Sequence, residues 1–85
     1  MIPIEQVQRM LERSFPGDRI ELSSPLGDDH HFQLVIVSGR FNGLPMVRQH
    51  QLVYAALGDA MREAIHALAL KTYTPEQWTK AGRQA

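Results

Sequence analysis

The chain has 85 residues, which predicts one domain over residues 1–85 with a small hydrophobic core. Nine lysines and arginines balance nine aspartates and glutamates, so no net charge draws the whole protein to nucleic acid or to a membrane surface. The absence of cysteine excludes disulfide bonds and any metal site built on the chain's own thiolates.

An amphipathic helix is the first predicted element. Pro3 suits its first turn, and Pro16 with Gly17 ends it. Its apolar side chains recur at helical spacing, as Ile4, Val7, Met10, Leu11 and Phe15. We therefore expect one face of this helix to pack on a sheet.

Two strands are predicted next. Residues 19–23 alternate polar and apolar, as a half-buried strand does, and a loop follows at 24–29. The central strand is predicted at 31–38. It is apolar on both faces, with Phe32, Leu34 and Ile36 on one and Val35 and Val37 on the other. This pattern predicts a strand that is covered on both sides.

The second half of the chain predicts two adjacent helices, a strand and a closing helix. Helical spacing resumes at 46–57, after a turn region at 39–45. Gly58 is expected to end this helix, and Asp59 to cap a second helix that runs to about residue 65. A last strand is expected at roughly 65–73. The predicted order is αββααβα.

The closing helix has a clear start signal. Thr74 is the predicted N-cap, Pro75 occupies the first helical position, and Gln77 stands at the capping-box position. Tyr73 and Trp78 are expected to pack this helix onto the sheet.

Six segments of the chain together resemble a known family. They are Gly-Asp-Asp-His-His-Phe-Gln at 27–33, Val-Ile-Val-Ser at 35–38, Phe-Asn-Gly at 41–43, Val-Arg-Gln-His-Gln-Leu-Val-Tyr at 47–54, Ile-His-Ala-Leu at 65–68 and Tyr-Thr-Pro-Glu-Gln-Trp at 73–78. With these separations the chain resembles the BolA family, most closely its IbaG-like branch.

The resemblance implies an α+β, class II KH-like fold, in which helices pack on a three-stranded mixed sheet. It also implies a heterodimer with a monothiol glutaredoxin of the CGFS type, sharing a glutathione-bound [2Fe-2S] cluster. A second implied role is transcriptional regulation and stress response. Neither role is enzymatic, and the serines lack a nucleophile-elbow context.

The expected partners and location follow from the same observations. In isolation we expect a monomer or weak homodimer without a cofactor. The chain has no apolar run of membrane-spanning length and no signal-peptide pattern, so we expect a soluble cytoplasmic protein with no membrane partner.

Histidines are the candidate cluster ligands. Imidazole replaces thiolate on the [2Fe-2S] clusters of Rieske centres, and histidine is the best cluster ligand in a chain without cysteine. The resemblance assigns this role to His66 and to a histidine of the loop between the first two strands, either His31, which is favoured, or His30. Such a complex should weaken as the pH falls toward about 6, near the pKa of free histidine. The alternative is that these histidines bind no metal and are simply hydrated, or packed against neighbours, at the ends of strands.

The helix at 46–57 is the candidate nucleic-acid surface. Arg40 and Arg48, together with Lys71, would form a thin basic patch, and His50 lies in the same helix. Many relatives carry a more basic stretch here, and phosphate contact depends on lysine and arginine. We therefore expect this helix to be mostly solvated surface, with DNA binding as the alternative function. A third alternative is a protein-interaction module without metal.

Overall fold

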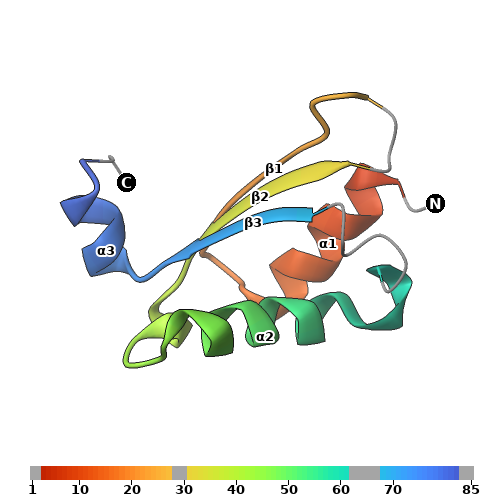
Figure 1. Ribbon diagram of the computed structural model, residues 1–85. Helices are drawn as coiled ribbons and strands as arrows, with labels where there is room; N and C mark the ends of the chain where they lie inside the picture. Colours follow the sequence, from red (N-terminus) through yellow and green to blue (C-terminus); the bar gives the residue numbers. More distant parts are fainter. Residues whose placement is uncertain (1–2, 28–30, 62–67, 83–85) are drawn as a thin grey trace.

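The computed structural model describes residues 3–27, 31–61 and 68–82 (Figure 1). Its elements are α1 (Ile4–Ser14), β1 (Arg19–Ser23), β2 (Phe32–Val37), the 3-10 helix η1 (Gly39–Phe41), α2 (Met46–Leu57), the 3-10 helix η2 (Gly58–Met61), β3 (Leu68–Tyr73) and α3 (Pro75–Lys80). Within these residues, none of the helices has the length and apolar content needed to cross a bilayer.

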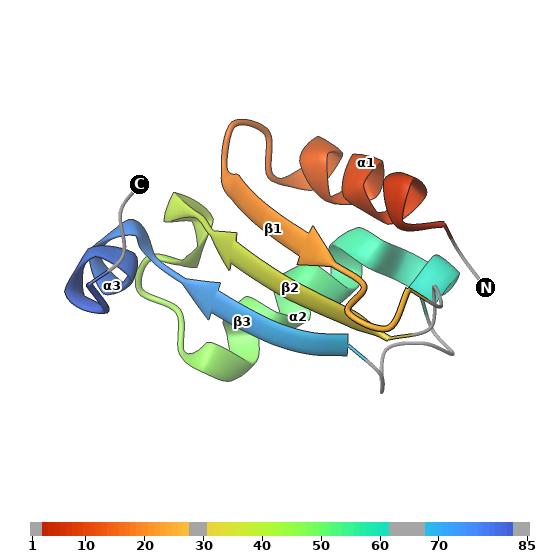
Figure 2. The same cartoon turned by 90° about the horizontal axis from the view of Figure 1, so that it is seen from above.

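The three strands form one mixed sheet in the order β1-β2-β3. β1 and β2 are antiparallel, with Arg19 opposite Val37. β2 and β3 are parallel, with Phe32 opposite Leu68, so both strands begin at the same edge of the sheet (Figure 2). The predicted three-stranded mixed sheet and α+β class are confirmed.

Helices α1 and α2 cover one face of the sheet (Figure 1). The amphipathic pattern of α1 places Val7 and Leu11 in the core, as its spacing predicts. The core lies between these helices and the sheet, and its buried members are Val7, Leu11, Phe15, Phe32, Leu34, Ile36, Phe41, Val53 and Leu57.

The prediction that the central strand is covered on both sides is wrong. Phe32, Leu34 and Ile36 are buried beneath the helices, but on the other face Gln33 is exposed and Val35 is half-buried. The reason is that α3 has only six residues, so it reaches only the end of this face where Val37 lies.

α3 is held at that end by aromatic packing. The Trp78 ring meets the Tyr73 ring edge-on, with centroids 5.1 Å apart, and the Arg19 guanidinium lies 5.5 Å from the Trp78 centroid. The expected packing of Tyr73 and Trp78 is confirmed.

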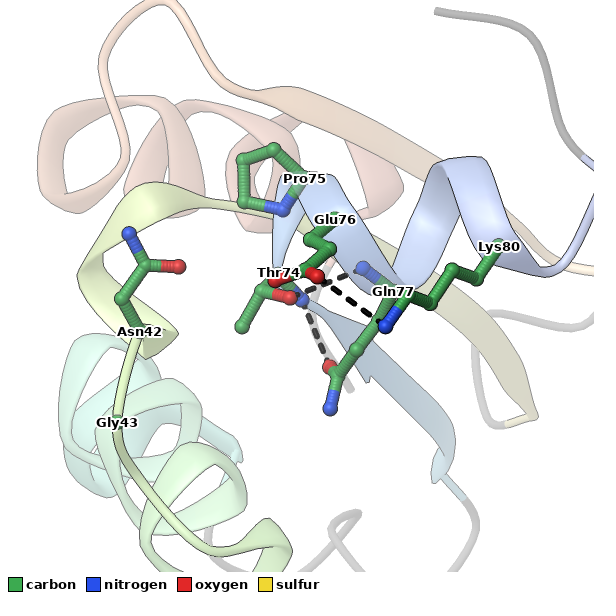
Figure 3. Close-up of a pocket in the computed structure, with 7 residues that line it drawn as sticks. All are labelled: Asn42, Gly43, Thr74, Pro75, Glu76, Gln77 and Lys80. Carbon is green, nitrogen blue, oxygen red and sulfur yellow. Dashed lines mark hydrogen bonds and ion pairs between the residues drawn. The ribbon is translucent and has the colours of Figure 1, made fainter.

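The start of α3 has its predicted capping box. The Gln77 backbone N–H donates to Thr74 Oγ1 at 3.1 Å, and the Thr74 backbone N–H donates to Gln77 Oε1 at 2.9 Å (Figure 3). Pro75 occupies the first helical position.

The prediction for the second of the adjacent helices differs from the structure. Gly58 ends α2 as expected, with φ 57°, which glycine adopts without strain. The positive φ turns the chain away from the helical path, and the chain then enters the 3-10 helix η2. Residues 62–67 lie outside the described residues, and with them the predicted continuation of this helix and the first three positions of the predicted last strand.

Candidate functional site

The edge where β2 and β3 begin is the place at which the predicted cluster ligands would have to meet. Because Phe32 and Leu68 are partners in a parallel pair, the first residues of β2 and β3 lie side by side at this edge. His31 directly precedes β2 and its side chain is exposed. The predicted ligands His30 and His66 lie outside the described residues.

The described residues do not form a metal site by themselves. Within 3–27, 31–61 and 68–82, no group of three or more histidine, cysteine, aspartate or glutamate side chains is arranged to hold a metal ion. His31 is therefore the one predicted ligand that the structure describes, and it is not part of such a group of side chains.

The three residues of the predicted basic patch lie on three different elements, η1, α2 and β3. Arg48 is exposed in the first turn of α2. The Arg40 guanidinium donates to the Ser14 carbonyl oxygen and lies 4.8 Å from the centroid of the Phe15 ring, so it ties η1 to the end of α1. Lys71 is on β3, next to a residue that bonds α2, and therefore faces away from α2.

His50 is half-buried in α2. Its Nε2 atom is buried and has no hydrogen-bond partner among the described residues, and its ring meets the Tyr54 ring edge-on at 6.4 Å. α2 is thus only partly solvated, because Gln49, Val53 and Leu57 turn one face of it into the core. This burial corrects the expectation that the helix is mostly solvated surface.

A buried polar link that was not predicted from the sequence joins α2 to β3. Gln49 is 2% exposed; its Nε2 donates to the Leu44 carbonyl oxygen at 2.9 Å, and its Oε1 accepts from Thr72 Oγ1 at 2.7 Å. In the sequence, Gln49 stands between an arginine and a histidine, a context that is typical of an exposed helix face. The signal that could have found it is its spacing of four and eight residues from Val53 and Leu57.

Two of the hollows on the described part of the chain lie beside the start of α2 and the start of α3. One, of about 570 Å³, is lined by Asn42, Gly43, Thr74, Pro75, Glu76, Gln77 and Lys80 (Figure 3). Its two charged side chains pair with each other, Lys80 Nζ to Glu76 Oε1 at 3.1 Å. The other, called here the α2 hollow, is about 420 Å³ and is lined by Leu44, Pro45, Arg48, Gln51 and Leu52.

Comparison with known families decides the classification of this chain. A family model described as BolA-like protein matches residues 17–77, which is most of the chain and includes all three strands. This chain belongs to the BolA family.

Relatives from bacteria and eukaryotes support the same family assignment. Over 81 aligned residues the chain is 41% identical to the protein named DNA-binding transcriptional regulator BolA of Escherichia coli, covering 87% of this chain and 77% of the relative. It is 36% identical over 84 residues to BolA-like protein 1 of Bos taurus, covering 89% of this chain but 62% of the bovine protein.

Solved BolA structures have the same fold. The crystal structure of a Bol-like protein from Babesia bovis superposes with a TM-score of 0.81 at 26% identity, covering 98% of this chain and 96% of that one. The BolA-like α+β fold that the sequence resemblance implied is therefore confirmed.

Proposed function

We propose that this BolA-family protein acts with a monothiol glutaredoxin of the CGFS type in binding and passing on a [2Fe-2S] cluster, as part of a stress response. The observation that carries the proposal is the parallel register of Phe32 with Leu68. It sets the first residues of β2 and β3 side by side, and in the sequence each of these strands follows a histidine. Only two peptide bonds separate His66 from the first residue of β3, and His31 directly precedes β2.

The donor chemistry of the chain fits a shared cluster. The chain has no cysteine, so it can offer imidazole but no thiolate. In the proposed complex, His66 and one loop histidine bind iron from this side. Of His31 and His30, the family resemblance favours His31, which directly precedes Phe32. The glutaredoxin cysteine and a bound glutathione supply the thiolates, and the cluster is the cargo.

His66→Ala is expected to destabilise the cluster of the reconstituted complex. Loss of a residue outside the metal's own ligand set typically costs 10–100-fold in metal affinity, so loss of a direct ligand should speed cluster transfer to a chelator by about tenfold or more. Visible absorption and circular dichroism of the complex with a monothiol glutaredoxin measure both the spectrum and the rate.

The matched control is His50→Ala, which removes the histidine of α2. It should leave the cluster spectrum unchanged. An unchanged spectrum and transfer rate in His66→Ala would remove His66 from the site. Calorimetry with cluster-free glutaredoxin measures docking in the absence of metal. His66→Ala should retain this docking, which separates cluster sharing from metal-free binding of the two proteins.

DNA binding is the second candidate, because the relative from Escherichia coli is named a DNA-binding transcriptional regulator. The candidate surface is α2, and of the four predicted contacts only Arg48 is an exposed cation on it. Affinity for DNA grows with the number of phosphates that cations neutralise. A single arginine is therefore a weak basis for this function.

In a gel-shift assay we expect little or no complex with duplex DNA at about 0.15 M salt, and only weak binding at low salt. Arg48→Ala should then differ little from Arg9→Ala, an exposed arginine of α1 that serves as the matched control. A sequence-dependent shift at the higher salt that Arg48→Ala abolishes and Arg9→Ala retains would instead establish α2 as a DNA-binding surface.

A further inference from the structure

Large apolar side chains are exposed at the start of α2. Met46 and Val47 are each 63% exposed, although most large apolar residues of the described chain are buried or half-buried. They stand in sequence between Pro45 and Arg48, two of the residues that line the α2 hollow. Exposed apolar side chains and a hollow with apolar walls are each typical of a site for another molecule.

The charge at this surface has one sign. Arg48 is exposed at the rim of the α2 hollow, and α2 contains no aspartate or glutamate. The first turn has no acidic residue, and Pro45 supplies no side-chain hydrogen bond to it. The positive charge of Arg48 is therefore not balanced from within α2, and it complements a carboxylate on a partner.

We propose that the α2 hollow docks an acidic amphipathic segment of a partner protein. Leucine-sized side chains of the segment fill the space between Leu44, Pro45 and Leu52, and a carboxylate pairs with Arg48. A protein segment fits better than nucleic acid because the site combines one cation with apolar walls, whereas nucleic acid is held by several cations. Lys71 lies on the other face of the sheet, and Arg40 is bonded to Ser14.

This docking site is remote from the proposed cluster site. Gln49, near the start of α2, bonds Thr72 near the end of β3, so the α2 hollow lies at the end of the sheet where β3 finishes. Figure 1 shows the first turns of α2 at the end opposite the start of β3. One BolA domain could therefore hold a partner at each end, and the inference does not depend on the proposed cluster function.

The test is a titration of the isotopically labelled chain, followed by NMR, with a short synthetic helical peptide. The peptide has glutamates on one face and leucines on the other. We expect saturable amide shifts centred on residues 44–52. Arg48→Glu should weaken binding by about tenfold, because it turns attraction into repulsion. Val47→Ser should weaken it severalfold. Arg9→Glu, the same charge change on α1, should have little effect.

A charge-swapped peptide, with lysine in place of glutamate, should bind Arg48→Glu better than the unmodified chain. His66→Ala should leave the titration unchanged, and Arg48→Glu should leave cluster formation with a glutaredoxin unchanged, so the two proposals fail separately. Absence of saturable shifts at 44–52, equal affinity of Arg48→Glu and the unmodified chain, or displacement of the peptide by duplex DNA would each overturn the inference.

Discussion

Phe41→Ala is expected to lower the free energy of unfolding by about 3–5 kcal/mol, the usual cost of removing a buried phenylalanine side chain. Phe41 is 0% exposed, and its ring centroid lies 5.6 Å from that of Phe15. A chain of 85 residues has a total stability of only about 4–13 kcal/mol. The variant should therefore be close to unfolding at room temperature.

The effect should reach beyond the core because Phe41 anchors the turn that leads into α2. Ser38 Oγ accepts the Arg40 backbone N–H at 3.1 Å and so caps η1. The Arg40 guanidinium lies over the Phe15 ring and donates to the Ser14 carbonyl oxygen, which ties η1 to the end of α1. Urea unfolding followed by circular dichroism measures the change.

Leu26→Ala is the matched control for Phe41→Ala. Leu26 is 67% exposed, so its loss should change the free energy of unfolding by less than about 0.5 kcal/mol. If Phe41→Ala cost less than about 1 kcal/mol, Phe41 would not be a core residue and the described path of η1 would be wrong.

Gln49→Ala is expected to lower the free energy of unfolding by about 2–4 kcal/mol. The substitution leaves a cavity and deprives both the Leu44 carbonyl oxygen and the Thr72 hydroxyl of their partner in a buried environment. Thr72→Val should cost about 1–3 kcal/mol, because it leaves Gln49 Oε1 unsatisfied. Gln51→Ala, an exposed glutamine two positions along α2, should be nearly neutral.

A double-mutant cycle separates the hydrogen bond from packing. Combining Gln49→Leu with Thr72→Val replaces both polar partners, so the double variant should lose less stability than the sum of its single variants, by about 0.5–3 kcal/mol. Strict additivity would mean that Gln49 and Thr72 do not interact in solution. Urea unfolding of the four proteins gives the four free energies.

Patterns of neighbouring residues were enough to predict the helices and strands whose bounds depend on nearby residues alone. The bounds of β1 and of α2 agree with the alternation at 19–23 and the helical spacing at 46–57. The Thr74 capping box also needs only residues within one helical turn. Family segments spread along the chain were enough to predict the BolA fold, which the family model and the solved structures confirm.

Features that depend on residues distant in the sequence could not be predicted. Gln49 becomes a core residue only because Thr72, 23 positions away, meets it across the α2–β3 contact. The open face beside Gln33 exists because the closing helix is short and packs at one end. Arg40, Arg48 and Lys71 are all cations, but only the folded chain shows that Arg40 bonds the end of α1 and that Lys71 faces away from α2.

The amino-acid sequence alone establishes that the chain offers four histidines and no cysteine as soft metal ligands, and that two of the predicted strands have an imidazole at or next to their start. The family resemblance implied a mixed sheet, but the register that sets Phe32 beside Leu68 is visible only in the folded chain, because it depends on contacts between segments 36 residues apart. Local patterns contain no information about such contacts, since each strand has the same alternation whichever direction its neighbour runs.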